Sequence, residues 1–401
     1  MNTAIASRSK ATTFPLSRTD VAGAFGDIGV LFPIAIALIT LNHLNPTAVF
    51  MAAGLTYILA GRYFQIPISV QPLKAVAAIA LATGLAPSAI ASAGVIMGIL
   101  LALVGITNTA AWLARLFTLP IVRGMQLGLG LLLAAEGLRL IFRQQVGLPL
   151  GHALHFTGWE IACAAAILLW VFHKSQRYPA ALVLLVAGLG LGCLARWGTP
   201  LSFSWGPVPP TLLNPRIDEF WKVLPLLVIP QFALTFGNSI VATENTAQIL
   251  YGPQARRVTI RGLTLSIALT NLASGFMQAA PMCHGSGGVT AHNKFGARTP
   301  TASYVIGSLC LLLALFGRAA ITLLQLIPLA VLGVFLVYVG LHHAAYLRDV
   351  LRRLPLLLIA VVVGLVSFFT TNLMWGFLTG FVLQAAIEIY IKVNLNRPAG
   401  A

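Results

Sequence analysis

The chain has 401 residues, of which 58% are hydrophobic and only 8% are charged, and its mean hydropathy is +0.90. Soluble proteins carry charge on roughly a quarter of their residues, so this composition excludes a soluble globular protein and predicts an integral membrane protein. The formal net charge of +16 does not indicate a nucleic-acid interface, because the Lys and Arg residues are scattered between apolar runs.

Residues 1–20 carry basic side chains but no apolar core, so we expect a cytoplasmic segment followed by a retained span and no cleaved signal peptide. Fourteen apolar runs follow, near residues 21–41, 46–62, 68–84, 88–106, 120–140, 158–173, 178–195, 222–249, 259–277, 282–291, 301–317, 321–342, 355–370 and 373–391. They predict an all-α polytopic membrane protein. Several are shorter than the about 20 residues that a span needs. Two of them directly follow Pro67 and Pro281, which predicts two broken helices.

The longest polar connection, residues 198–221, carries five prolines before Arg216 and is predicted to be an external linker. It divides the chain into a seven-segment half at 21–197 and a second half at 222–391. Residues 392–401 then form a short cytoplasmic tail, and we expect no soluble C-terminal domain.

The two halves resemble each other at matching positions. Residues 55–61 and Pro67 recur as residues 269–275 and Pro281 at an offset of 214, and Phe25-Gly26-Asp27 recurs as Phe236-Gly237-Asn238 at an offset of 211. Because each half has an odd number of segments, the second must enter the membrane upside down. We therefore predict a 7+7 inverted-repeat transporter fold. A chance match between apolar segments is the alternative, which the paired proline breaks make less favoured.

If the segments alternate from a cytoplasmic N-terminus, the Lys and Arg residues on the cytoplasmic side outnumber those on the external side by about three to one. This bias follows the positive-inside rule. It predicts a multi-pass protein of the cell membrane, the inner membrane in a bacterium, with both termini cytoplasmic.

The broken helices contain the candidate site. A helix that starts inside the membrane leaves its first amides unpaired, and its positive end attracts anions. In an inverted repeat the two starts should meet near the midplane, where such transporters bind substrate. We expect the substrate to contact the following side chains and backbone groups: Gln71, Lys74, His284, Gly285, Ser286, Gly287 and Gly288.

Lys74 would supply a full positive charge, whose burial costs about 2.5–3.5 kcal/mol at a helix centre unless an anion offsets it. An ion pair with Asp27 or Glu244 is the alternative to substrate contact. The segment from Gly285 to Gly288 has neither the spacing nor the preceding strand of a phosphate loop, and tight packing is its alternative role.

Three acidic residues lie deep in apolar runs, where an ionised carboxylate without a role is costly. We hypothesise that Glu244 couples transport to protons, because desolvation favours protonation of a carboxylate. Asp27 is as consistent with a structural hydrogen bond to a crossing helix as with a role in transport. Glu136 lies three residues before Arg139 and predicts an ion pair near a helix end.

The remaining motifs point to structure. His43, His152, His155, His342 and His343 lie at predicted membrane edges and are interpreted as interfacial. Gly124/Gly128 and Gly188/Gly192 have the small-xxx-small spacing of packed helices. The four cysteines lack paired spacing, and no metal-binding or nucleophile motif is present, so we expect no metal, no cofactor and no enzymatic activity.

At the broken helices the chain resembles the molybdate transporter family, which is related to the sulfate permeases. The resemblance is carried by residues 67–75, residues 280–288, residues 294–298, residues 25–29 and residues 237–245. It implies a core domain, which holds both broken helices, moving against a gate domain. It also adds Asn238 and Asn245 to Asp27 and Glu244 as supporting or coupling residues. Leu73 and Ser286 depart from the family pattern, where methionine and alanine are expected.

The sequence thus predicts a secondary transporter of a small tetrahedral oxyanion, molybdate first and sulfate or tungstate next, with proton coupling and an elevator-like core movement. Its expected partners are the oxyanion, protons, the bilayer and a second copy in a homodimer. The alternatives are a proton-coupled nucleobase permease of the same fold, an intramembrane enzyme and a passive anion channel.

Overall fold

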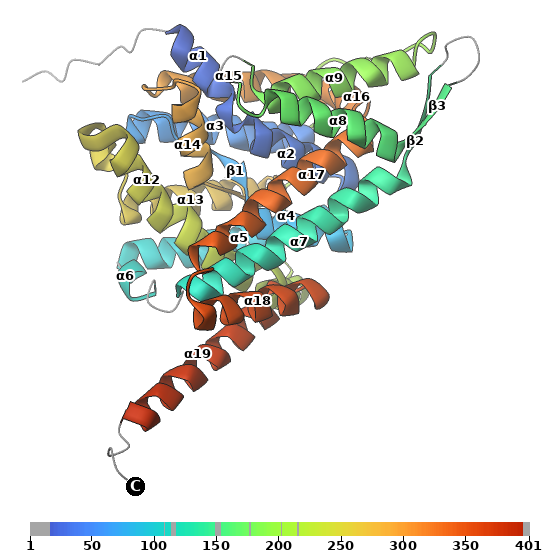
Figure 1. Cartoon of the computed structure of the whole chain (residues 1–401). Helices are drawn as coiled ribbons and strands as arrows, with labels where there is room; N and C mark the ends of the chain where they lie inside the picture. Colours follow the sequence, from blue (N-terminus) through green and yellow to red (C-terminus); the bar gives the residue numbers. More distant parts are fainter. Residues whose placement is uncertain are drawn as a thin grey trace, which may run out of the picture.

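The computed structural model describes residues 17–395 except 108, 114–117, 149–153, 176–177, 202 and 215. Within these residues the chain is mainly helical (Figure 1). The helices of the first predicted half are α1 (Arg18–Ala24), α2 (Ile28–Leu41), α3 (Pro46–Phe64), α4 (Lys74–Thr83), α5 (Pro87–Thr107), α6 (Ala110–Leu113), α7 (Leu119–Arg143), α8 (Gly158–Phe172) and α9 (Ala180–Ala195).

The helices of the second predicted half are α10 (Ile217–Val223), α11 (Ile229–Leu234), α12 (Ala242–Tyr251), α13 (Ile260–Phe276), α14 (Ser286–Lys294), α15 (Thr301–Leu315), α16 (Gly317–Leu324), α17 (Leu329–Ala344), α18 (Leu354–Phe369) and α19 (Leu373–Leu395). Short pairs of strands are β1 (Gln71–Pro72) with β4 (Met282–Cys283), and β2 (Gln145–Leu148) with β3 (Leu154–Thr157). Both pairs are antiparallel.

All fourteen predicted runs contain helix, with differences at their ends. The run predicted at 321–342 was wrong at its start, because α16 bends by 99° from α15 and α17 begins only at Leu329, after Pro328. The linker ends earlier than predicted, since α10 starts at Ile217. The hairpin of β2 and β3 was not predicted.

Six helical stretches are long and apolar enough to span a bilayer by themselves, or seven if α15 and the bent segment after it count as one. They are Arg18–Leu41, Pro46–Phe64, Pro87–Thr107, Leu119–Arg143, Ile217–Arg257 and Leu329–Asp349. Shorter apolar helices, α4, α8, α9 and α18 among them, pack beside these. This is the structure of a multi-pass membrane protein.

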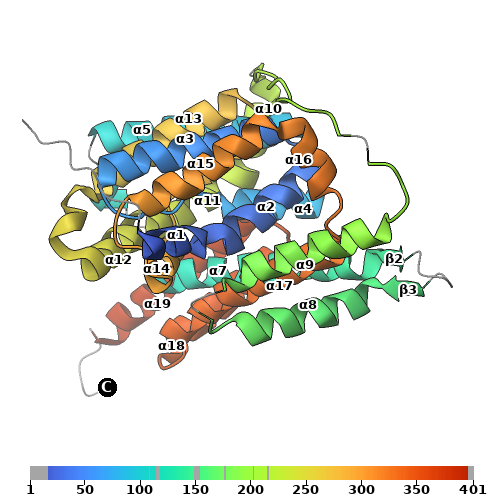
Figure 2. The same ribbon diagram turned by 90° about the horizontal axis from the view of Figure 1, so that it is seen from above.

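The helices form two packed groups, seen side by side in Figure 2. The core group contains α1 to α5 and α10 to α16, in which α5 lies along α13 and α3 lies along α15. The gate group contains α7, α8, α9, α17, α18 and α19, and α7 packs along α17 over most of its length. The helices α4 and α11 of the core group contact α7, so the boundary between the groups runs along this helix.

Glycines allow the close crossing of α7 and α17. A Cβ atom at Gly130 would lie 2.5 Å from the carbonyl oxygen of Gly340, and one at Gly137 would lie 2.5 Å from that of Gly333. Real Cβ atoms do not approach backbone so closely. Small residues at helix crossings are a common means of association within membranes, where water does not drive burial.

The packing roles predicted for the small-xxx-small motifs are confirmed. Gly124 and Gly128 of α7 lie against α18, where Cβ atoms would come within 2.6 Å of side chains or backbone. A Cβ at Gly192 of α9 would lie 1.8 Å from the carbonyl oxygen of Leu326, and Gly188 faces Val331 of α17.

Several features of the two halves correspond. Each half packs its second long helix on the fourth segment of the other, as α3 does on α15 and α13 on α5. After α3 and after α13 the chain turns through a left-handed glutamine, Gln65 at φ 60° and Gln278 at φ 50°. These parallels support the inverted repeat, which stays a prediction.

Candidate functional site

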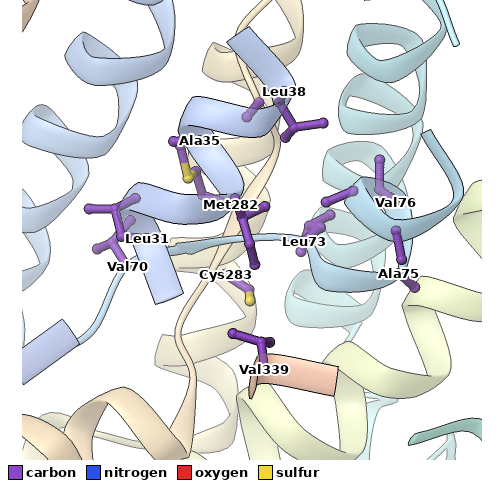
Figure 3. Packing of buried hydrophobic residues seen from close by; sticks show 14 of the residues in the cluster. Leu31, Ala35, Leu38, Val70, Leu73, Ala75, Val76, Met282, Cys283 and Val339 are labelled. Atoms are coloured by element: carbon purple, nitrogen blue, oxygen red, sulfur yellow. The ribbon is translucent and has the colours of Figure 1, made fainter. Parts of the chain in front are cut away.

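The two broken helices meet where β1 pairs with β4. Gln71 lies opposite Cys283 and Pro72 opposite Met282, and the amide of Leu73 donates to the carbonyl of Pro281 at 2.8 Å. In Figure 3, Leu73 and Met282 lie beside this crossing and Cys283 points toward Val339 of α17. Because α4 begins at Lys74 and α14 at Ser286, both helices start directly beside the crossing.

Polar side chains tie the crossing segments together. The Ser69 hydroxyl donates to the carbonyl of Gly285 at 2.6 Å and accepts from its amide at 2.9 Å. Asn271 of α13 donates to the carbonyl of Met282 and accepts from its amide, both at 2.9 Å. These bonds satisfy backbone groups that would otherwise be buried without partners, so the crossing is held in one geometry.

A chain of buried side chains leads from α3 to the start of α4. Tyr57 donates to Asp27 Oδ2 at 2.5 Å, Gln71 Nε2 donates to Asp27 Oδ1, and Lys74 Nζ donates to Gln71 Oε1 at 2.6 Å. Asp27 is 1% exposed and Lys74 is 7% exposed. The structural hydrogen bond considered for Asp27 is therefore present, and Asp27 reaches Lys74 through Gln71.

Lys74 is not in an ion pair in the described part of the chain. The ion pairs there are Arg123 with Asp349, Glu136 with Arg139, and Arg216 with Asp218. The pairing predicted for Glu136 is confirmed, at 3.7 Å. The direct pairing of Lys74 with Asp27 or Glu244, which was the alternative to substrate contact, is not observed.

A cavity of about 20 Å³ opens beside the Lys74 side chain. Its walls come from the core group through α4, α11 and β4, and from the gate group through α7 and α17. It is lined by Lys74, Gln126, Leu129, Gln231, Leu234, Asn238, Ser239, Cys283 and His343.

Asn238 and Asp27 hold corresponding places in the predicted repeat, and both lie at irregular turns. Asp27 ends a 3₁₀ turn between α1 and α2, and Asn238 lies in a π-helical turn, Thr235–Val241. π-Helical turns inside helices occur frequently at functional sites. Asn238 accepts a hydrogen bond from Ser286 at 3.3 Å, which joins it to the start of α14.

The glycines after His284 differ in their surroundings. A Cβ atom at Gly288 would lie 2.4 Å from Ser69 Cβ and 2.5 Å from Asp27 Oδ1, and one at Gly285 would lie 2.8 Å from Gln71 Oε1. Gly287 is exposed, and its nearest neighbour would be the Tyr346 hydroxyl at 4.0 Å. Gly285 and Gly288 thus let α14 approach the Asp27–Gln71 pair.

His284 is 1% exposed and has both ring nitrogens engaged, one at 2.8 Å from the Ser69 carbonyl and one at 2.8 Å from the Ser266 hydroxyl. Its own carbonyl accepts from Thr243 at 3.1 Å. In this structure His284 therefore positions the crossing segments, and its substrate contact stays a prediction.

Glu244 and Asn245 lie apart from the cavity lining. Glu244 is partly buried and accepts from the amide of Ile260 at 3.1 Å, at the first turn of α13, where a carboxylate is favourable. Asn245 is exposed. The geometry assigns Glu244 a stabilising contact, and its proton coupling stays a prediction.

Four polar residues of the cavity, Gln126, Gln231, Ser239 and His343, were not predicted from the sequence. His343 was interpreted as interfacial, which was wrong, since it is 6% exposed and lines the cavity. Gln126 and Gln231 are 1% and 3% exposed, and Gln231 Oε1 accepts from the amide of Ala75 at 2.8 Å. Uncharged polar residues in apolar runs were the signal that could have found both glutamines.

A larger cavity, of about 380 Å³, lies under the linker and is lined by Ile39, Thr40, His43, Leu44, Asn45, Pro46, Pro87, Val208, Pro209, Thr211, Gln278, Ile321 and Gln325. This lining contains neither a lysine nor an arginine. The smaller cavity is the better candidate for a charged solute because of Lys74.

Sequence comparison finds a family described as "Molybdate transporter of MFS superfamily", which matches residues 19–133 and 224–342, one stretch in each predicted half and together more than half of the chain. The chain is 28% identical to Molybdate transporter 2 of Arabidopsis thaliana, over 94% of this chain and 88% of that protein. It is 27% identical to Molybdate transporter 1 of Chlamydomonas reinhardtii, over 96% of this chain and 94% of that protein.

Among solved structures the fold is similar to SLC26A9, with a TM-score of 0.67 and 17% identity, over 93% of this chain and 65% of that chain. It is also similar to the transmembrane domain of the cyanobacterial bicarbonate transporter BicA, with a TM-score of 0.66 and 17% identity, over 90% of this chain and 97% of that one. At these identities the likeness shows the fold alone.

Proposed function

The chain belongs to the molybdate transporter family and is a membrane anion transporter, not an enzyme; from this premise we propose that it carries a small tetrahedral oxyanion, molybdate first and sulfate or tungstate next. The site for this oxyanion is the cavity beside Lys74, between the core and gate groups. The core group supplies the broken helices and the gate group closes against them.

The observation that carries the proposal is the buried, unpaired charge of Lys74. Its ammonium group is bonded to a neutral amide, that of Gln71, instead of a carboxylate. A lysine at this depth is costly unless an anion accompanies it. One of its three N–H groups is used on Gln71, which leaves two for an oxyanion.

The starts of α4 and α14 add to this attraction. Each places the positive end of a helix dipole beside the crossing of β1 and β4, and at α4 the amides of Ala75 and Val76 are bonded to Gln231 Oε1. An oxyanion offers acceptor oxygens in several directions and no apolar face. The site supports such a solute better than a nucleobase, which needs carboxylate or amide acceptors as well as donors.

A cavity of about 20 Å³ has room for about one water molecule, which is less than a tetrahedral oxyanion needs. Substrate binding therefore requires α4 and α14 to move away from α7 and α17. We propose that the core group slides against the gate group, in an elevator-like movement that exposes the site to each side in turn.

We also propose coupling to protons, with Asp27 as the first candidate because it is linked to Lys74 through Gln71. Protonation of Asp27 would weaken its bond from Gln71 and thereby loosen the support of Lys74. We expect Asp27→Asn to flatten the pH dependence of uptake, while Glu244→Gln keeps it and lowers only stability. Uptake by reconstituted protein at a series of pH values, with a fixed membrane potential, measures this. Flattening by Glu244→Gln alone would instead identify Glu244 as the coupling acid.

Uptake by purified protein in liposomes tests the substrate. We expect labelled molybdate to accumulate, and unlabelled tungstate and sulfate to compete while uracil does not. Competition by uracil without transport of molybdate would favour a nucleobase permease. Current that follows the anion gradient without any effect of a proton gradient would indicate a passive channel.

The orientation in the membrane is part of the proposal. The distribution of Lys and Arg supports cytoplasmic termini, in the inner membrane of a bacterium, and a homodimer stays a prediction. Labelling of single cysteines introduced at residues 200 and 394 from either side of intact cells would test the orientation.

A further inference from the structure

Gln126 of α7 presents an unused hydrogen-bond donor inside the cavity. Its side chain is 1% exposed, and its Nε2 atom has no hydrogen-bond partner among the residues that the structure describes. A buried donor without a partner is destabilising, because it has lost its bond to water. Such a group in a cavity that also contains a lysine is placed to receive an acceptor.

The orientation of the Gln126 amide is set by its neighbour. Arg123 Nη1, one turn earlier on α7, donates to Gln126 Oε1 at 2.8 Å. A guanidinium group can only donate, so the amide oxygen must face Arg123 and the NH₂ group must face away from it. The NH₂ group is therefore the part of Gln126 left for the cavity.

Arg123 is itself held in place by two contacts. Its Nη2 atom lies 2.5 Å from Asp349 Oδ2, and its guanidinium carbon lies 5.3 Å from the centre of the Tyr346 ring. Because Arg123 is thus anchored to the chain beyond α17, the amide of Gln126 is oriented by the gate group alone.

The core group also orients a glutamine amide, that of Gln71, but with its oxygen directed to the cavity lysine. Asp27 accepts from Gln71 Nε2, so that Gln71 Oε1 faces Lys74 Nζ and holds it at the cavity. A charged neighbour thus fixes one glutamine on each side of the cavity. The result is a set of donors, Lys74 from the core group and Gln126 from the gate group, that face the same space.

We propose that Gln126 is a substrate-binding residue contributed by the gate group, whose Nε2 N–H donates to an oxygen of the oxyanion that Lys74 binds. This assignment rests on the proposed function. Because the cavity must widen to admit the anion, the contact forms once α4 has moved far enough from α7 for one oxyanion to bridge Lys74 and Gln126. Arg123 is a positioning residue for this contact.

The test uses Gln126→Glu in the full-length protein. The substitution keeps an oxygen for Arg123 and nearly the same shape, but it replaces the NH₂ donor with an acceptor that repels an anion. A hydrogen bond to a charged group contributes about 1.5–3 kcal/mol, so we expect molybdate to bind at least tenfold more weakly. Molybdate binding to purified protein and the KM and maximal rate of uptake measure the change.

Gln144→Glu is the matched control, because it makes the same substitution at the residue that directly follows α7. Gln144 lies outside the cavity lining, and its Oε1 accepts from the amide of Ala330 at 3.0 Å, which a carboxylate can still do. We expect its molybdate affinity to equal that of the wild type. Gln126→Leu is a second variant, and it should also weaken binding at least tenfold without adding a charge.

The outcomes separate the two proposals. If the wild-type protein does not bind molybdate, the proposed function fails. If the wild type binds molybdate and a folded Gln126→Glu or Gln126→Leu protein binds it equally well, the role of Gln126 alone is overturned. An equal loss in Gln144→Glu would likewise overturn it, because the effect would then follow from charge on α7.

Discussion

Lys74→Met is expected to abolish molybdate uptake while the protein remains folded. The substitution removes the buried positive charge of the cavity but keeps a side chain of similar length. Without that charge, an oxyanion would enter the site at a cost of about 2.5–3.5 kcal/mol, which corresponds to roughly a hundredfold loss of affinity. Uptake and molybdate binding by reconstituted protein measure the effect.

The stability of Lys74→Met is expected to change little. Gln71 Oε1 loses its donor, at a cost of about 1–3 kcal/mol, but the burial of an unpaired charge is relieved as well. Thermal unfolding in detergent measures the balance. Lys222→Met, at an exposed lysine of α10, is the control for the loss of one positive charge and should transport normally. Normal molybdate uptake by Lys74→Met would show that the site is elsewhere, although the fold would stand.

Gly288→Ala is expected to destabilise the protein by about 1–3 kcal/mol and to reduce uptake strongly. The added methyl group would lie 2.4 Å from Ser69 Cβ, 2.5 Å from Asp27 Oδ1 and 2.7 Å from Gln71 Nε2. None of these atoms moves freely, because Ser69 is bonded to Gly285 and Asp27 is bonded to Tyr57 and Gln71. The start of α14 must therefore shift away from the crossing, and the support of Lys74 shifts with it.

The neighbouring glycine provides a matched control for stability. A methyl group at Gly287 would meet only the Tyr346 hydroxyl, at 4.0 Å, so Gly287→Ala should unfold at or slightly above the wild-type temperature. Both variants replace glycine by alanine in the first turn of α14, so helix propensity cancels between them. Equal stability of the two variants would contradict the close packing of Gly288 against Asp27.

Much of the fold follows from local patterns of sequence. Each apolar run contains helix because a chain within a bilayer must satisfy its backbone hydrogen bonds internally. The two non-helical stretches inside the membrane were predicted from Pro67 and Pro281. After each proline the chain stays extended until α4 begins at Lys74 and α14 begins at Ser286. The predicted runs do separate near the bend between α15 and α16, but α16 was joined to α17 in the run 321–342, across residues 325–328, which are largely apolar.

Some of the residues predicted for the site from the sequence likewise lie there, and one does not. Gln71, Lys74 and Ser286 were found from sequence because they flank the breaks, and Asp27 was found because an acid is conspicuous in an apolar run. Glu244 was equally conspicuous, yet it lies at the start of α13 and outside the cavity lining. A buried acid is costly wherever it lies, so its cost alone does not show which group it contacts.

The sequence by itself determined the membrane class, the helical segments, the two proline breaks and the lysine beside one of them. These properties depend on composition, on periodicity and on residues close in the chain. Only the tertiary structure decided that β1 and β4 pair, that Asp27 supports Lys74 through Gln71, and that Gln126 and His343 face the same cavity. The physical reason is that these contacts join residues up to about 270 positions apart, through the packing of α4 and α17 against α7, and no local pattern specifies that packing.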